Sequence, residues 1–195
     1  MYKRQQFILP YYDFNRQIFE NNYEGAINFS SSGSNDLNNT NNLRTKVVND
    51  LNFQSPDFIS KNGFKSAYNV YFKNLNTIAK NDSIYKTNPQ MELMSIFELN
   101  TSFPLINRAK NSINYFTPMA SLRFNPGDMK DYSSSDRSVN VSSIFDINRL
   151  AIDDSFEEGK SLTLGFDYKR TKLNDINKFF EAKIATVYRL SLIHI

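Results

Sequence analysis

The densest group of acidic side chains in the sequence is formed by Asp153, Asp154, Glu157 and Glu158. Carboxylates gathered in this way are the ligands that a hard cation such as Ca²⁺ takes in proteins. Their spacing, however, lacks the alternate-position ligands and the central glycine of a calcium-binding loop. A solvated loop is therefore the favoured interpretation, and we expect neither a metal site nor a catalytic centre in this segment.

Two further patterns could carry function: pairs of acidic residues with arginines, and a segment that mixes aromatic and basic residues. The pairs Asp136 with Arg137 and Asp146 with Arg149 are interpreted as ion pairs or polar contacts within loops. The segment FKSAYNVYFK, residues 64–73, mixes aromatic rings with lysines as a nucleic-acid platform would. A β-strand explains its alternation more simply, and a net charge of +3 spread along the chain does not favour nucleic acid. We therefore predict no nucleic-acid partner.

Most catalytic chemistry is excluded by residue type. The chain has no cysteine, so it can form no disulfide, thiolate nucleophile or cysteine-based metal site. It has one histidine, His194, close to the end of the sequence. Phosphate-binding, dinucleotide-binding, zinc-protease and serine-hydrolase motifs are all missing. We expect a protein that is not an enzyme and that holds no cofactor.

Composition favours β-structure. The 195 residues are 40% hydrophobic, with a mean hydropathy of −0.52, yet they include 11 Tyr and 17 Phe in a background rich in Asn and Ser. Aromatic residues in a polar, non-helical background are typical of strands. No run of 18 apolar residues is present, so no transmembrane helix is expected. Met1-Tyr-Lys-Arg leads into Gln5 and Gln6 without the apolar stretch of a secretory signal, which predicts either a cytosolic protein or an internal fragment.

Apolar and polar residues alternate one by one along much of the chain, which is the period of a β-strand. We predict about eight strands of about ten residues each, a length that matches the ~9–11 residues of a bilayer-crossing strand better than the ~5–6 of soluble sheets. The predicted fold is all-β, an antiparallel meander of long strands. The predicted strands are 5–14, 23–31, 43–54, 64–75, 89–99, 112–124, 161–170 and 180–188.

Each predicted strand has one apolar and one polar face. In 161–170 the apolar face is Leu162, Leu164, Phe166 and Tyr168, and the polar face includes Ser161, Thr163 and Asp167. A soluble sheet turns its apolar face inward, whereas a membrane barrel turns it outward to lipid. Alternation alone does not distinguish these. The length of the strands favours a membrane barrel. The polar faces carry charges in mid-strand, which the wet interior of a barrel would tolerate; those charges are Lys46, Asp50, Glu92 and Lys183.

The predicted connections differ in length. Segments 31–42, 76–88 and 125–160 are long and polar, whereas 15–22, 55–63 and 100–111 are shorter or contain Pro and Gly. Outer-membrane barrels characteristically pair long external loops with short periplasmic turns. Long and short connections alternate only imperfectly along this chain. The pattern therefore supports the barrel interpretation but does not establish it.

Residues 144–168 carry a more specific pattern. An Asn-Arg element (Asn148, Arg149) precedes Leu150, and an alternating strand with an internal glycine follows. This pattern resembles the C-terminal barrel domain of the lipopolysaccharide-assembly outer-membrane protein family (LptD). Ile152 stands where the family has glycine, and Ser155 where it has arginine. The stretches 7–14 (FILPYYDF) and 115–128 (YFTPMASLRFNPGD) also resemble family strands. The matching residues are Asn148, Arg149, Asp154, Phe156, Glu157, Gly159 and Gly165.

The resemblance implies a function and a location. Residues 1–195 would be part of a very large β-barrel in the outer membrane of a Gram-negative bacterium, without the signal peptide and the N-terminal jelly-roll of the family. The barrel would insert lipopolysaccharide into the outer leaflet. Implied partners are lipopolysaccharide, an LptE-like plug lipoprotein, a periplasmic lipopolysaccharide-bridge protein and outer-membrane lipid. The acidic segment 144–159 would be a polar loop at the water-exposed rim of the barrel.

Two alternatives stay open at the level of sequence. One is another outer-membrane barrel, such as a porin or a receptor. The other is a soluble β-sheet module that binds carbohydrate. The direction of the apolar face in three dimensions separates the soluble module from both barrels.

Overall fold

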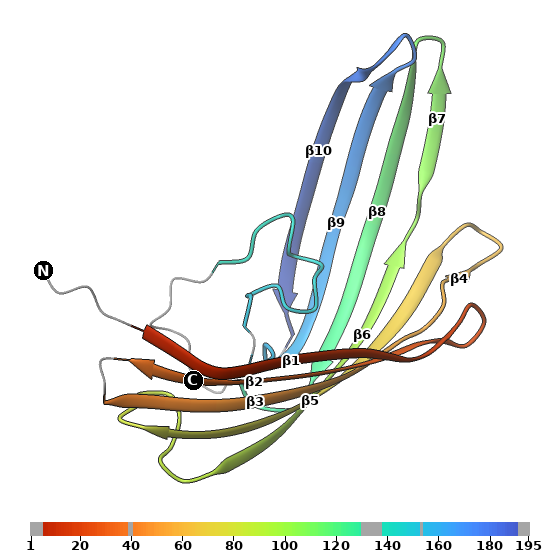
Figure 1. Ribbon diagram of the computed structural model, residues 1–195. Helices are drawn as coiled ribbons and strands as arrows, with labels where there is room; N and C mark the ends of the chain where they lie inside the picture. The colour runs from red at the N-terminus through yellow and green to blue at the C-terminus, as the bar shows by residue number, and fades with distance from the viewer. Residues whose placement is uncertain (1–5, 39–40, 130–137, 153, 191–195) are drawn as a thin grey trace, which may run out of the picture.

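The computed structural model describes residues 6–38, 41–129, 138–152 and 154–190, and the strands within them form a single antiparallel sheet (Figure 1). Its strands follow one another as a meander in the order β1-β2-β3-β5-β6-β8-β9-β10. This described part of the chain contains no helix that could cross a membrane. The bounds are β1 Gln6–Asn21, β2 Gly25–Asn38, β3 Asn42–Gln54, β4 Phe58–Ile59, β5 Lys65–Lys80, β6 Gln90–Ser102, β7 Leu105–Ala109, β8 Ser112–Asn125, β9 Gly159–Lys172 and β10 Asp175–Arg189.

The all-β antiparallel meander predicted from the sequence is confirmed, and all eight predicted strands are present. Two short strands, β4 and β7, were not predicted. They pair with the ends of β5 and β8, inside segments that were expected to be connections. The long strands reach 13 to 16 residues, longer than predicted.

The lengths predicted for two loops are wrong. Strand β2 runs on to Asn38 and β5 to Lys80, so residues 31–38 and 76–80, which were expected in loops, are strand. The expected connection 15–22 is also mostly strand. Serine, threonine and asparagine in these segments pair across neighbouring strands. Ser31 Oγ donates to Asn49 Oδ1 at 2.7 Å, and Thr45 Oγ1 donates to Asn35 Oδ1 at 2.6 Å. Cross-strand pairs of this kind stabilise a sheet, so a polar composition did not mark loops here.

The sheet is strongly curved, and residues 138–152 and 154–158 lie on its concave side (Figure 1). The convex face carries the apolar side chains, which remain in contact with solvent: Phe72 is 52% exposed, Leu93 73% and Ile184 60%. The concave face carries polar side chains, and many of these are buried, among them Lys73, Glu98, Ser121, Arg123 and Thr163. The sheet is therefore inverted relative to a soluble sandwich, in which the apolar face is the buried one.

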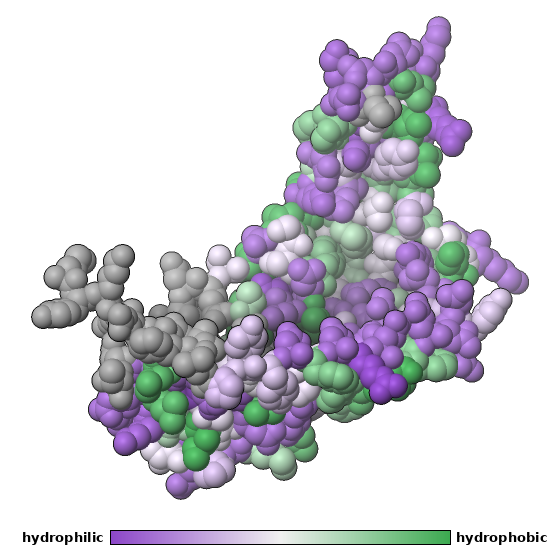
Figure 2. All heavy atoms as spheres, in the orientation of Figure 1, coloured by the Kyte–Doolittle hydropathy of each residue, from purple (hydrophilic) through white to green (hydrophobic). Residues whose placement is uncertain are grey.

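The faces predicted for residues 161–170 are confirmed. Ser161 and Thr163 are buried on the concave face, whereas Leu164 is exposed on the other side. Figure 2 shows hydrophilic residues around the hollow of the sheet and hydrophobic residues along its lower, outer side. A small apolar cluster lies beneath the long loop on the concave face. Its members are Val48, Leu75, Ala79, Tyr85, Met94, Ile96 and Phe156.

Candidate functional site

The candidate site is the contact between the concave face of the sheet and the loop residues 138–152 and 154–158. The turn that shapes this loop is closed by Asn148. Its Oδ1 accepts the Ile152 N–H at 2.7 Å, and its carbonyl oxygen accepts the Ala151 N–H at 3.0 Å. Ala151 adopts a left-handed conformation with φ 51°. The chain therefore turns sharply over 148–152 and returns towards β9.

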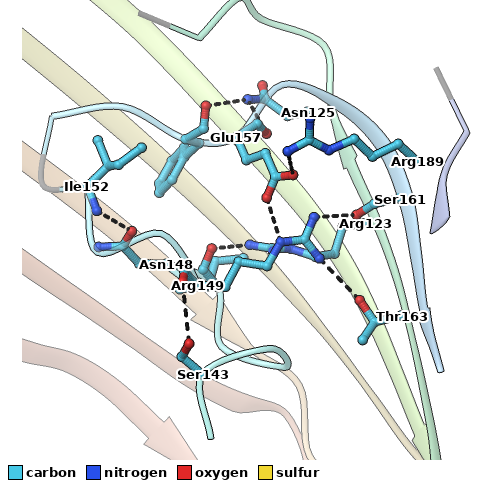
Figure 3. Close-up of polar contacts among 12 residues, drawn as sticks. Arg123, Asn125, Ser143, Asn148, Arg149, Ile152, Glu157, Ser161, Thr163 and Arg189 are labelled. Atoms are coloured by element: carbon cyan, nitrogen blue, oxygen red, sulfur yellow. Dashed lines mark hydrogen bonds and ion pairs between the residues drawn. The ribbon is translucent and has the colours of Figure 1, made fainter. Parts of the chain in front are cut away.

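Arg149 anchors the loop to strand β9 (Figure 3). Its guanidinium is buried, and its Nε lies 2.5 Å from Glu157 Oε2. Its two terminal nitrogens donate to Thr163 Oγ1 and Ser161 Oγ, both at 3.2 Å. A buried charge is tolerated only when it is paired and hydrogen-bonded, and Arg149 meets both conditions.

Two more arginines converge on the same region from β8 and β10. Arg189 Nη2 lies 2.9 Å from the second oxygen of Glu157. Arg123 is buried; it donates to the Ile147 carbonyl oxygen, and its Nε lies 3.7 Å from Glu98 Oε1. Glu98 in turn accepts hydrogen bonds from the strands around it (Asn69 at 2.9 Å, Ser121 at 3.3 Å and Asn100 at 2.9 Å). The network therefore joins the loop to β5, β6, β8, β9 and β10.

The descending half of the loop is held by its backbone and by one ring. Asn125, at the end of β8, donates from Nδ2 to the carbonyl oxygens of Glu157 at 3.1 Å and Phe156 at 3.4 Å. Phe156 is buried in the concave apolar cluster. Lys73 Nζ lies 5.2 Å from the centre of the Phe156 ring and forms an ion pair with Asp50 at 2.8 Å. A cation over a ring adds attraction to the burial of the ring.

Two carboxyls of the loop, Asp154 and Glu157, have pKa values shifted in opposite directions. Burial raises the pKa of Asp154, although the positive charges of Lys46, Arg44 and Lys73 oppose the rise. The Tyr85 hydroxyl donates to this carboxyl. Burial would also raise the pKa of Glu157, but the hydrogen bond and charge of Arg149 outweigh it, and the charges of Arg189 and Arg123 add to the effect. The net result is a lowered pKa for Glu157.

The interpretation of the acidic segment as a solvated loop is wrong for two of its carboxyl groups. Asp154 is buried on the concave face, the side chain of Glu157 is largely buried at 10% exposure, and Glu158 is exposed. Asp153, Asp136 and Arg137 lie outside the described residues. Within the described residues, Arg149 forms its ion pair with Glu157 and not with Asp146. The acidic loop is matched by arginines from distant strands, which a local sequence pattern does not reveal.

The two glycines of the predicted set occupy positions that need glycine. Gly159 has φ 81° where β9 begins. A Cβ on Gly165 would lie 2.7 Å from the Ile184 carbonyl oxygen and 2.8 Å from the Ala185 Cβ, so β9 and β10 could not approach as closely. At the first departure from the family pattern, Ile152 is buried. The left-handed residue that would suit glycine is Ala151, one position earlier.

The structure thus brings together five of the predicted site residues and adds others. Asn148, Arg149, Asp154, Phe156 and Glu157 all seat the loop against the sheet. Sequence reasoning missed Arg123, Asn125, Glu98 and Arg189. The signal that could have found Arg123 is a charge on the polar side of a strand, between Leu122 and Phe124. No cluster of metal-binding side chains occurs among the residues that the structure describes.

Comparison with known proteins adds no family. No protein-family model matches the chain, and no curated protein matches it.

Chemically, the arrangement is an anchor that fixes the irregular loop to the polar face of the sheet. It consists of two carboxylates and three guanidinium groups, those of Glu98, Glu157, Arg123, Arg149 and Arg189.

Proposed function

We propose that this chain is part of the wall of a large outer-membrane β-barrel that inserts lipopolysaccharide into the outer leaflet of a Gram-negative bacterium. The observation that carries the proposal is the direction of the two faces. The apolar face is convex and exposed, and the polar face is concave and covered by a loop held through buried charges. A soluble carbohydrate-binding module would bury the apolar face instead.

The convex face has the chemistry of a surface that contacts lipid. Its side chains carry no charge over Met91–Thr101 in β6, Phe116–Phe124 in β8 and Leu162–Tyr168 in β9. A Lys or Arg at the middle of a bilayer would cost about 2–4 kcal/mol on such a face. Aromatic rings also gather around Tyr68, whose ring centre lies 5.7 Å from Phe53, 6.1 Å from Phe58 and 6.4 Å from Phe97. Such aromatic groups are typical of the girdles of membrane barrels.

The concave face supports the transport part of the proposal. Polar side chains on this face would line a hydrated path for the sugar headgroup of lipopolysaccharide. The residues on which the resemblance to the LptD family rests, above all Asn148, Arg149 and Glu157, are those that fix the loop to this face. That correspondence favours lipopolysaccharide assembly over a porin or a receptor. The proposal includes the family's partners, an LptE-like lipoprotein and a periplasmic lipopolysaccharide-bridge protein, and it takes the chain to be part of a longer protein.

The proposal is tested on the full-length gene product in its own bacterium. Membrane fractionation with a heat-modifiability gel should recover it in the outer membrane as a folded, heat-shifted band. Depletion should then lower the amount of newly made lipopolysaccharide at the cell surface. Recovery in the soluble fraction would overturn the proposed lipopolysaccharide-assembly barrel and also the alternative of a porin or receptor. An outer-membrane location with unchanged surface lipopolysaccharide would favour a porin or a receptor.

A further inference from the structure

Positive charge gathers at the end of strands β7 to β10 where the short β7–β8 and β9–β10 turns lie (Figure 1). Residues 105–116 and 168–180 form this end, which we call the basic rim. The Leu173 N–H donates to the Asn111 carbonyl oxygen at 3.1 Å and joins the two turns. The β1–β2 turn lies on the same edge of the sheet, but residues 16–28 around it contain one cation and two carboxylates. The basic rim contains one carboxylate, Asp175, and six cations, Arg108, Lys110, Lys169, Arg170, Lys172 and Lys178.

Most of the cations of the basic rim have no counter-charge. Lys178 forms an ion pair with Asp175 at 3.2 Å. The other cations of the rim form no ion pair with another described residue, and all of them are exposed. Figure 2 shows hydrophilic residues over this end of the molecule. Exposed charges of one sign at one place attract a partner of the opposite sign.

Arg170 and Lys172 lie on the convex, apolar face of β9. Strand β9 pairs with β8 without a break in register up to Lys172, so side chains at even positions stay on one face with Leu164. Aromatic rings come directly before the cations on this face. The centre of the Tyr168 ring lies 6.2 Å from that of Phe180, and Phe180 is the residue of β10 that pairs with Arg170. The convex surface therefore passes from apolar side chains through aromatic rings to cations.

The spacing of cations on this face matches the thickness of a membrane. Lys160 lies at the other end of β9, where its Nζ is 5.3 Å from the centre of the exposed Phe124 ring. The convex side chains of β9 between Lys160 and Arg170 are uncharged. Ten residues extend about 33 Å along a strand, and a barrel tilt of about 40° reduces this to about 25 Å, the height of the apolar band of outer-membrane barrels. Arg170 and Lys172 would thus lie at the level of the lipid headgroups.

The connections indicate which leaflet the basic rim meets. Residues 126–158 connect β8 and β9 at the opposite end of these strands. Outer-membrane barrels have long external loops and short periplasmic turns, so the basic rim belongs to the periplasmic side. We propose that the basic rim binds the anionic headgroups of phospholipids in the periplasmic leaflet, through Arg170 and Lys172 on the convex face and Lys110 in the adjoining turn.

The position of the cations favours lipid over an acidic protein as the partner. Arg170 and Lys172 continue the apolar face of β9 beyond its aromatic rings, and such rings are typical of the boundary between acyl chains and headgroups. A cation close to an anionic membrane surface strengthens binding by about 5-fold. The inference rests on the barrel part of the proposed function, because it takes the convex face to contact lipid.

The experiment uses the full-length protein in detergent micelles. The protein is mixed with equal amounts of phosphatidylglycerol, which is anionic, and phosphatidylcholine, which has no net charge. Native mass spectrometry then counts the lipids that stay bound. Wild type should retain phosphatidylglycerol in preference, and the preference should fall as salt is added, because the cations are exposed. Equal retention of the two lipids would overturn the inference. Displacement of phosphatidylglycerol by an equal concentration of inorganic phosphate would also overturn it, because the rim would then select free phosphate.

Variants on the two faces of β9 locate the binding. Replacing both Arg170 and Lys172 by Gln removes two cations and should lower the preference for phosphatidylglycerol by about 5- to 30-fold. Lys169→Gln is the matched control, because Lys169 lies between them on the concave face, with its Nζ 5.0 Å from the centre of the Phe179 ring. This control should keep the preference. An unchanged preference in the double variant, with a normal heat-modifiability shift, would contradict the proposal, as would an equal loss in the control.

The same variants separate lipid from protein and this inference from the proposed function. If the double variant keeps its lipid preference but loses an acidic protein that co-purifies with wild type, the basic rim docks a protein and the lipid inference is wrong. Absence of a preference in a protein that is inserted in the outer membrane and needed for surface lipopolysaccharide would overturn the headgroup site alone. A preference that depends on Arg170 and Lys172 in a protein without effect on surface lipopolysaccharide would overturn lipopolysaccharide assembly and leave the headgroup site in place.

Discussion

At the scale of single residues, Glu157 is the centre of the buried network, because both of its oxygens face arginines. Replacing Glu157 by Gln leaves Arg149 and Arg189 without a counter-charge. Since breaking a largely buried ion pair costs about 3–5 kcal/mol, we expect Glu157→Gln to lower the free energy of unfolding by about 3 kcal/mol. Urea unfolding of the full-length protein in micelles measures this.

The neighbouring residue provides the control for this variant. Glu158 is exposed and accepts the Met129 N–H at 3.1 Å. Glu158→Gln makes the same chemical change at the surface and should alter the free energy of unfolding by about 0.5 kcal/mol or less. Equal losses in the two variants would mean that the arginines do not depend on Glu157.

The opposite pKa shifts of Glu157 and Asp154 predict opposite dependences on pH. Glu157 has a pKa below its ordinary 4.5 in the folded protein, so it stabilises the fold above that value. This contribution is lost as the pH falls through the lowered pKa, and the difference between wild type and Glu157→Gln should close there. Unfolding free energies measured across acidic pH test the sign.

Asp154 behaves in the reverse sense because its pKa is raised above the ordinary 3.8. Its ionisation destabilises the fold as the pH rises from that value through the raised pKa. Asp154→Asn keeps an oxygen that can accept from Tyr85, so it should be at least as stable as wild type at neutral pH. The two proteins should converge in acid. A loss of stability at neutral pH that persists in acid would show that Asp154 is not disfavoured as an ion.

The turn at residues 148–152 gives a prediction that runs against the family pattern. The resembling family has glycine where this chain has Ile152. The side chain of Ile152, however, is buried and only 2% exposed. Ile152→Gly should therefore cost about 3 kcal/mol or more, in the range of large-to-small changes in a core. Ala151→Gly should be neutral or stabilising by up to about 1 kcal/mol, because it relieves a left-handed alanine. The reverse order of the two melting temperatures would mean that the glycine position is 152.

At the scale of elements, the sequence was sufficient for the eight long strands and their faces, although not for the short strands β4 and β7. The period of two is a local signal, and it placed Leu164 and Ser161 on opposite sides of β9 without any knowledge of their neighbours. Loop lengths failed because Ser31 and Asn35, in a segment whose polar composition predicted a loop, pair across strands with Asn49 and Thr45. The site was only half predicted, since Arg149 and Glu157 are near in sequence whereas Arg123 and Arg189 reach them only through the sheet.

The convex face of β9 carries the prediction for this scale. Leu164→Lys places a charge on the apolar face and should cost about 2–4 kcal/mol in a lipid bilayer. If that face were in water, the cost would be small, because Leu164 is already 40% exposed. Asn28→Lys adds the same charge on the concave face of β2 and should be close to neutral. Unfolding free energies in lipid vesicles decide between lipid and water on the convex face.

At the scale of the whole molecule, the described sheet has two unpaired edges, β1 and β10. Exposed edges invite pairing with further strands. Large aromatic and aliphatic side chains are exposed on both edge strands, including Tyr12 and Phe14 on β1 and Phe180 and Tyr188 on β10. The sheet is therefore suited to continuation on both sides, as a segment of a larger curved wall would be, with the anchored loop narrowing the space inside the curve.

The anchored loop leads to the last prediction, which concerns the permeability of the barrel that we propose. Glu157→Lys would place a fourth cation beside Arg149, Arg189 and Arg123, and like charges brought together in a buried site repel strongly. The loop should leave the concave face and widen the passage, so cells that carry the variant should take up a large polar antibiotic faster than wild type. Glu158→Lys makes the same change in charge at an exposed neighbour and should leave uptake unchanged. If Glu157→Lys inserts normally and uptake stays at the wild-type rate, the loop does not limit passage through the proposed barrel. If both variants raise uptake equally, the effect comes from added charge and not from loss of the anchor.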